Sequence, residues 1–237
     1  CDTNDFDTIE AEIRKGCKVL YLETPTNPTL KIVDVERLSR VAHQHGAVVV
    51  VDNTFATPIN QRPLELGADL VAYSATKFLN GHSDVMGGLV TGRKELVDRI
   101  FHYREITGAT LHPQSAYMIL RGMKTLELRI ERHNQNAMRV ATYLSQHPKV
   151  EQVFYPGLET HLNHAIAKKQ MSGFGGVLSF ALKGDFDKVV IVLENLQYAH
   201  KAASLGSVGT LAGPPRTTSH VELSAQERAN AGIPESL

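Results

Sequence analysis

The run at residues 47–52 constrains the fold more than any other feature of this sequence. It consists of one alanine, four valines and a final aspartate, so it offers no polar face to water. A continuous apolar run of this length is typical of a parallel strand that is covered on both faces. We therefore expect a parallel sheet with helices on both sides.

Strands and helices alternate along the first part of the chain with short connections. We predict strands at 18–22, 47–52, 69–73 and 87–92, and helices at 7–16, 35–45 and 62–67. Asp34 is placed to cap the second helix, and Gly46 to end it. This order implies an α/β fold with a mainly parallel sheet and right-handed crossovers.

Beyond residue 93 the pattern becomes more helical. We predict helices at 93–107 and 114–146 with a break near Gly122, then strands at 151–155, 175–182 and 199–204 with helices at 163–171 and 186–196. Ser224 and Glu227 have the spacing of a capping box that opens a last short helix. We predict that residues 1–127 belong to a large domain and residues 128–237 to a smaller α+β domain.

Composition excludes several classes of function. Basic and acidic residues balance at 25 each, so nothing predicts binding to nucleic acid or to a membrane surface. Cys1 and Cys17 are too few for a disulfide framework and lack metal-ligand spacing. No Gly-x-Gly-x-x-Gly or Walker loop is present. A cytoplasmic, soluble protein is the expectation.

Reactive side chains follow three successive predicted strands. Asn27 comes after the first strand, Asp52 ends the second, and Ser74, Thr76 and Lys77 follow the third. Because ligands of open α/β sheets bind beyond the carboxyl ends of the strands, we expect these groups to converge. Taken singly, Asp52 could be a turn former and Lys77 a solvated surface lysine. Their joint placement favours a binding site.

The surroundings of Lys77 predict its chemistry. An apolar strand precedes it and Phe78 and Leu79 follow it, so the amine is expected to be partly desolvated, with a lowered pKa. A Schiff-base lysine, hydroxyls on a phosphate and an aspartate on a pyridinium nitrogen are what pyridoxal phosphate requires. We assign these roles to Lys77, to Ser74 and Thr76, and to Asp52.

Five separated motifs resemble those of one known family. They are residues 69–83 around Lys77, Glu23-Thr-Pro-Thr-Asn-Pro28, Val51-Asp-Asn-Thr54, Arg121-Gly-Met-Lys-Thr-Leu126 and Ser204-Leu-Gly206. In this order they are similar to the Cys/Met-metabolism pyridoxal-phosphate enzymes. The resemblance implies fold-type I, with residues 1–127 in the cofactor-binding domain. It also implies dimers with shared active sites that usually pair into tetramers.

The resemblance carries roles to individual residues. It implies that Lys77 is the Schiff-base lysine, Asp52 the pyridinium partner, and Ser74 and Thr76 phosphate ligands. Asn27 would lie beside the ring hydroxyl and near substrate. Ser204 would border the substrate carboxylate.

The resemblance also implies that the chain is a part of a longer polypeptide. Family members have a preceding segment with a Gly-Met phosphate loop and a ring-stacking tyrosine, and a carboxylate-binding arginine that would fall just beyond Leu237. We expect the chain alone to lack catalytic activity.

Residues outside these motifs bear on the reaction. Ala203 stands where the γ-synthases and γ-lyases for cystathionine commonly have a glutamate. Residues 107–113 look closest to methionine γ-lyase, although Arg104-Glu105 replaces its Lys-Asp pair and residues 212–220 depart from its pattern. We predict a carbon–sulfur lyase that eliminates a thiol from a sulfur amino acid. The alternative is a γ-replacement transsulfuration enzyme, like cystathionine γ-synthase or O-acylhomoserine sulfhydrylase.

Other functions have weaker support. His43 and His45 face different sides of a helix, and His161 and His164 lack an evident third ligand, so we predict no metal site. His82 is expected to support the lysine loop and not to act as an acid. A binding module or an inactive partner subunit remains an open alternative.

Overall fold

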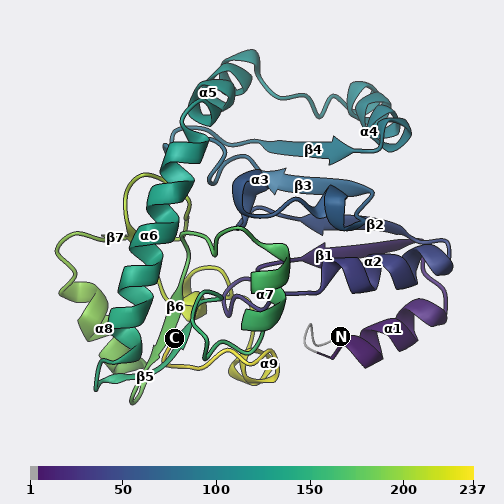
Figure 1. Ribbon diagram of the computed structural model, residues 1–237. Coiled ribbons are helices and arrows are strands. Elements are labelled where there is room, and N and C mark those ends of the chain that lie inside the picture. The colour runs from purple at the N-terminus through teal and green to yellow at the C-terminus, as the bar shows by residue number, and fades with distance from the viewer. Residues whose placement is uncertain (1–4) are drawn as a thin grey trace.

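A four-stranded sheet lies at the centre of the computed structural model, which describes residues 5–237 and so leaves Cys1 outside (Figure 1). Its strands are β1 (Val19–Glu23), β2 (Val48–Asp52), β3 (Leu70–Ser74) and β4 (Gly88–Gly92), in that spatial order. The first three are parallel to one another. This confirms the predicted mainly parallel α/β sheet.

The carboxyl ends of the parallel strands meet at one edge. Glu23 pairs with Asp52 and Asp52 with Ala72, so β1, β2 and β3 end almost level. The heads of the β1 and β3 arrows point toward the long helix α6 (Leu126–Ser145) in Figure 1. The loops that follow these strands therefore lie at the same edge of the sheet.

Helices pack on one face of the sheet because their apolar stripes match the apolar strands. The helix α2 (Val35–Gln44) begins at Asp34, whose side chain accepts a hydrogen bond from the Arg37 amide as predicted. The helix α1 (Phe6–Arg14) is capped by Asp5, slightly earlier than expected. Buried Val49 and Val51 of β2 join residues of both helices in the main core.

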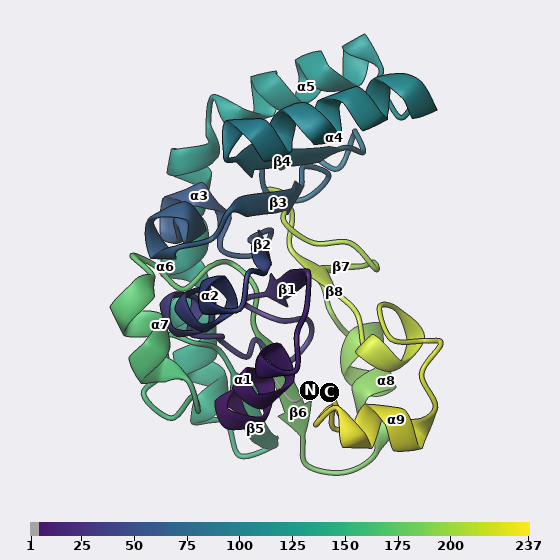
Figure 2. The ribbon, with the colours of Figure 1, turned by 90° about the vertical axis from the view of Figure 1, so that its right-hand side faces the viewer.

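The expectation that both sheet faces are covered is wrong for β1. Val19 and Tyr21 are 54% and 58% exposed, whereas Leu22 on the other face is buried. Figure 2 shows α2, α3 (Thr57–Asn60) and α7 (His164–Gln170) on one side of the strands. On the opposite side the same view shows β7 (His200–Lys201), β8 (Leu211–Ala212) and α8 (Phe186–Glu194). An apolar run predicts a strand but does not show whether both of its faces are covered.

The strand β4 is the antiparallel member of this mainly parallel sheet. It pairs antiparallel with β3, from Leu70 opposite Gly92 to Ser74 opposite Gly88. Residues 75–87 form a loop without a helix. Because a parallel return needs a crossover connection, the strand that follows this loop runs back along its neighbour.

The predicted long helix at 114–146 is two helices. The helix α5 (Pro113–Met123) ends just before α6 begins, and α4 (Lys94–Thr107) precedes them. The break falls next to Gly122, as expected, where a Cβ would lie 2.2 Å from the Asn80 carbonyl oxygen. The glycine thus allows the end of α5 to approach the loop after β3.

The last part of the chain holds two small sheets. In one, β5 (Val150–Phe154) pairs antiparallel with β6 (Ser179–Leu182), and in the other β7 pairs parallel with β8. The predicted strands at 175–182 and 199–204 are therefore shorter, and α3, the 3₁₀ turn at Pro63–Leu66 and β8 were not predicted as such. The capping box of Ser224 and Glu227 is confirmed at α9 (Ala225–Asn230).

Within residues 5–237, no helix has the length and apolar character that a membrane span requires.

Candidate active site

Lys77 lies on the loop that leaves the carboxyl end of β3. Its Nζ donates a hydrogen bond to Oγ of Ser204 over 3.2 Å, so two residues 127 positions apart meet at this point. The side chain is half-buried. Burial lowers the pKa of the Lys77 amine below its ordinary value, as the sequence predicted, because desolvation disfavours the charged form.

The loop of Ser204 is fitted closely against that of Lys77. Gly206 has φ +86°, and a Cβ there would lie 2.7 Å from the Phe78 amide nitrogen and 3.2 Å from Cα of Lys77. Further along, the Val208 amide donates to the Gly81 carbonyl over 3.0 Å. Only glycine has both the backbone conformation and the space that this contact needs.

Asp52 lies at the end of the neighbouring strand with one hydrogen bond to each oxygen. The Thr54 amide donates to Oδ1 over 3.0 Å, and the Tyr21 hydroxyl donates to Oδ2 over 3.3 Å. Burial and the nearby Asp52 carboxylate raise the pKa of the Tyr21 hydroxyl, which keeps it a donor. The carboxylate is half-buried, with room for a further donor.

The two residues after Asp52 support the edge of the sheet. Asn53 is fully buried, and Nδ2 of its side chain donates to the Thr57 and Gln61 carbonyls. Oγ1 of Thr54 accepts a hydrogen bond of 2.8 Å from the Ser74 amide. Each polar residue of this motif thus has a defined contact that fixes the ends of β2 and β3.

The two hydroxyls predicted to bind phosphate differ in their surroundings. Ser74 is half-buried at the end of β3. Oγ1 of Thr76 accepts a hydrogen bond of 3.0 Å from the Gly87 amide and lies 3.4 Å from the Gly87 carbonyl. Among residues 5–237, the long contact with the Gly87 carbonyl is the one acceptor of the Thr76 hydroxyl proton, so this proton can turn toward a stronger acceptor.

Asn27 is at the same edge, in the turn after β1. Its backbone N–H donates to Oε1 of Glu23 over 3.1 Å, and the residue is exposed. Burial raises the pKa of Glu23 above its ordinary value. The hydrogen bond from Asn27 lowers this pKa and the nearby Asp52 carboxylate raises it, so the net shift is upward. The strand order brings Asn27 to the edge that holds Asp52 and Lys77, while Ser204 is the predicted residue that contacts Lys77 directly.

Tyr21, Thr54 and Arg129 contact the predicted site residues or their loop, but sequence reasoning did not select them. Tyr21 could have been found from register, because it lies two residues before Glu23, which pairs with Asp52. Thr54 belonged to a recognised motif. Arg129 lies on α6 and had no signal in the sequence, since its contacts are to backbone carbonyls far along the chain.

The histidines that invited a metal reading have other contacts. Nε2 of His43 lies 2.9 Å from Oδ2 of Asp69, and Nδ1 of His164 bonds the Pro156 carbonyl. His161 is buried, and burial lowers its pKa. Nδ1 of His82 bonds the Asn80 carbonyl over 2.7 Å, which fits its predicted role in supporting the loop. Among residues 5–237, no group of three or more His, Cys, Asp or Glu side chains could hold a metal ion.

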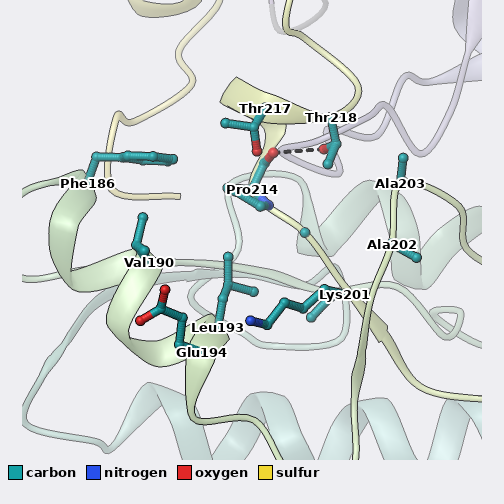
Figure 3. Close-up of a pocket in the computed structure, with 12 residues that line it drawn as sticks. Phe186, Val190, Leu193, Glu194, Lys201, Ala202, Ala203, Pro214, Thr217 and Thr218 are labelled. Carbon is teal, nitrogen blue, oxygen red and sulfur yellow. Dashed lines mark hydrogen bonds between the residues drawn. The ribbon is translucent and has the colours of Figure 1, made fainter.

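Two cavities lie away from Lys77. One, of about 360 Å³, is lined by α8 and by the segments around Ala202 and Pro214 (Figure 3). The other, of about 450 Å³, is lined by parts of β5 and by His161. Lys77 lines neither cavity.

A carboxylate, two hydroxyls and a partly desolvated lysine at the carboxyl edge of a mainly parallel sheet define an α/β protein of the pyridoxal-phosphate type. The donor set fits that cofactor: an amine for its aldehyde, a carboxylate for its ring nitrogen and hydroxyls for its phosphate.

Comparison with known proteins gives the family. The family model described as "Cys/Met metabolism PLP-dependent enzyme" matches residues 1–237, so the chain belongs to this family. The membership confirms pyridoxal phosphate as the cofactor. The chain is 51% identical to an L-methionine gamma-lyase of Fusobacterium nucleatum subsp. polymorphum over 239 aligned residues, covering 100% of this chain and 60% of that protein.

Solved structures agree in fold. A cystathionine gamma synthase from Xanthomonas oryzae pv. oryzae in complex with cystathionine superposes with TM-score 0.96 and 40% identity, covering 99% of this chain and 61% of that one. A cystathionine gamma-lyase from Lactobacillus plantarum complexed with L-serine gives TM-score 0.95 and 40% identity, with coverage of 100% and 62%. The chain thus spans about 60% of the length of these proteins.

Proposed function

We propose that the native polypeptide carrying this chain is a pyridoxal-phosphate-dependent carbon–sulfur lyase that acts on a sulfur amino acid. The reaction is an elimination like that of methionine γ-lyase, with a thiol, ammonia and a 2-oxo acid as products. The observation that carries the proposal is the half-buried Lys77 amine beside Ser204, with its lowered pKa, at the edge where Asp52 ends β2.

The cofactor-binding roles follow from the chemistry of each side chain. Lys77 would hold the cofactor covalently, and the anionic Asp52 carboxylate would accept a hydrogen bond from the protonated ring nitrogen. Ser74 and Thr76 would donate to its phosphate, and the Asn27 amide would lie beside its ring hydroxyl. Once bound, the cofactor supplies an electron sink for a carbanion at the substrate's α-carbon.

Proton movement would depend on Lys77. An amine with a lowered pKa has a larger unprotonated fraction near neutral pH, so it can take a proton from the substrate's α-carbon. The Ser204 hydroxyl, which already accepts a hydrogen bond from Nζ, would hold the amine on the side where substrate enters. Ser204 would also border the substrate carboxylate.

Two observations support elimination. The chain is 51% identical to a methionine γ-lyase over its whole length. Ala203, immediately before Ser204, has no charge with which to hold the distal amino group of cystathionine. The second candidate is γ-replacement, favoured by the TM-score of 0.96 against the cystathionine gamma synthase structure.

Product analysis separates these reactions. The native polypeptide is supplied with pyridoxal phosphate and L-methionine, and 2-oxobutyrate and methanethiol are measured. Release of both products supports the lyase, and Lys77→Ala should abolish it while the exposed control Lys124→Ala should not. Absence of release, with formation of cystathionine from an O-acylhomoserine and cysteine, would refute elimination and establish replacement.

Assembly, domain division and location are further parts of the proposal. We propose a homodimer or homotetramer with shared active sites, with residues 1–127 in the cofactor-binding domain and 128–237 in a smaller one. The half-buried free thiol of Cys17 suits a reducing compartment, which supports a cytoplasmic location. Light scattering of the native polypeptide tests the assembly, and a monomer would contradict it.

A further inference from the structure

Arg129 lies in the first turns of α6, at the start of the helix nearest to the Lys77 loop. Its Nη1 donates to the Phe78 carbonyl over 2.8 Å, and its Nη2 lies 3.4 Å from the Leu79 carbonyl. Nη2 also donates to the Gly122 carbonyl over 2.9 Å, and Nε donates to Oγ1 of Thr125 over 3.1 Å. One guanidinium therefore joins the Lys77 loop to the junction of α5 and α6.

Arg129 supplies hydrogen-bond donors to backbone carbonyls of the Lys77 loop that have no other donor among the described residues. The Lys77 carbonyl accepts from the Gly81 amide, the Asn80 carbonyl from His82 and the Gly81 carbonyl from the Val208 amide. The two remaining carbonyls of this stretch, at 78 and 79, have Arg129 as their donor. Buried carbonyl groups without a donor are costly, so the guanidinium completes the hydrogen bonding of the loop.

Space around the guanidinium is restricted as well. Gly81 has φ +76°, and a Cβ there would lie 2.1 Å from Nη1 of Arg129. One helical turn on, His133 packs edge-on against the ring of Phe78, with centroids 5.4 Å apart. Phe78 is thus fixed at both its ring and its carbonyl by the same face of α6, directly after Lys77.

All four contacts of Arg129 are to neutral oxygens, and burial lowers its pKa below the ordinary value. Within residues 5–237, no carboxylate pairs with the Arg129 guanidinium. A planar guanidinium can reach several carbonyls in fixed directions, which a lysine ammonium cannot reproduce.

We propose that Arg129 is a positioning residue for Lys77, holding the backbone of residues 77–81 in the conformation that directs the lysine amine toward Ser204. The inference deepens the proposed function, since it concerns the lysine to which that function assigns the cofactor. It does not make Arg129 a catalytic residue, because its contacts are to the loop.

The test measures Lys77 itself in the native polypeptide without added cofactor. Labelling with acetic anhydride over a pH series, read by mass spectrometry of the Lys77 peptide, gives both its pKa and its maximal rate. The variants are Arg129→Met, which keeps an apolar stem, and Arg129→Lys, which keeps the charge. The control is Arg132→Met, at an exposed position three residues further along α6.

In Arg129→Met we expect the pKa of Lys77 to rise toward that of an exposed lysine, and its maximal rate to rise severalfold, because water and reagent reach a loosened loop. Arg129→Lys should lie between this variant and the wild type, and Arg132→Met should match the wild type. A lower melting temperature with unchanged Lys77 titration would overturn the proposal, since a purely structural arginine would give that result. Wild-type titration in Arg129→Lys would also overturn it, and this variant decides the question if the methionine variant does not fold.

A second readout uses added pyridoxal phosphate. Borohydride reduction should fix the cofactor on Lys77 in the wild type, with weaker retention in Arg129→Met. If the wild type fixes none, the proposed function fails while the labelling series still decides the role of Arg129. If the wild type and Arg129→Met retain the cofactor equally, the positioning role fails and the proposed function stands.

Discussion

Asp69 provides the sharpest test of how this fold is stabilised. Its side chain is 6% exposed at the start of β3, opposite the edge that bears Lys77. Oδ2 accepts from the Val49 amide over 2.8 Å and lies 2.9 Å from Nε2 of His43, and Oδ1 accepts from Arg93 over 2.9 Å. We predict that Asp69→Asn destabilises the native polypeptide substantially.

The size of the effect follows from these contacts. Asparagine retains one carbonyl oxygen, so the Val49 bond can persist, but its amide group then faces the donor of Arg93. Hydrogen bonds to charged groups contribute about 1.5–3 kcal/mol each. With one lost and the His43 contact weakened, we expect a loss of roughly 2–4 kcal/mol, or about 5–15 °C in melting temperature for a chain of this size.

The difference between wild type and Asp69→Asn should also depend on pH. Burial by itself raises the pKa of Asp69, but the Val49 amide, His43 and Arg93 outweigh it and hold the pKa below the ordinary value. A carboxyl with a depressed pKa in the folded state stabilises fully above its unfolded pKa of about 3.9, and loses that contribution as pH falls through the folded pKa. The gap in melting temperature should therefore be constant near neutrality and narrow below about pH 4.

Scanning calorimetry over a pH series measures both effects. The control is Glu95→Gln, which removes an exposed partner of Arg93 and should change stability by no more than about 0.5 kcal/mol. A loss below about 1 kcal/mol in Asp69→Asn, or a gap that is the same at pH 3 and pH 7, would refute the reasoning.

Three further outcomes are expected. Lys77→Ala should leave no borohydride-stable cofactor on the native polypeptide, read as the absence of a mass increase, whereas retention would place the cofactor elsewhere. Gly206→Ala should lower both the melting temperature and the cofactor retention. The new Cβ would lie 2.7 Å from the Phe78 amide nitrogen, and the backbone φ of +86° disfavours any residue but glycine. Cofactor retention equal to that of the wild type would contradict the close packing of the two loops. Tyr155→Phe removes a buried hydroxyl that donates to the Gly175 carbonyl over 2.9 Å. It should cost about 1–2 kcal/mol by thermal denaturation, and a neutral result would mean that water replaces the donor.

Sequence reasoning located much of the candidate site because its evidence was local. The apolar run before Asp52 predicted a strand, and the position of Asp52 at its end predicted the edge where it lies. Lys77 was placed in the same way from the strand before it. In a parallel sheet the carboxyl ends of strands share an edge, so one-dimensional order was enough to bring these residues to the same region.

What sequence reasoning missed depended on what packs against or connects each element. The strand pattern predicted β4 but not its direction, which is antiparallel because no helix intervenes after Thr76. The exposed side chains of Val19 and Tyr21 show that an apolar segment need not be covered on both faces. The division at residue 128 stays a prediction.

The sequence by itself determined which strands form and which candidate site residues lie at their ends, because strand periodicity and the motif around Lys77 are read from neighbouring positions. Only the tertiary structure decided that Ser204 meets the Lys77 amine and that Arg129 bonds the carbonyls beside it. These contacts join residues 127 and 51 positions apart. Contacts across such distances depend on how the elements pack. Every residue has a backbone carbonyl, so the sequence does not indicate which carbonyl a distant arginine will contact.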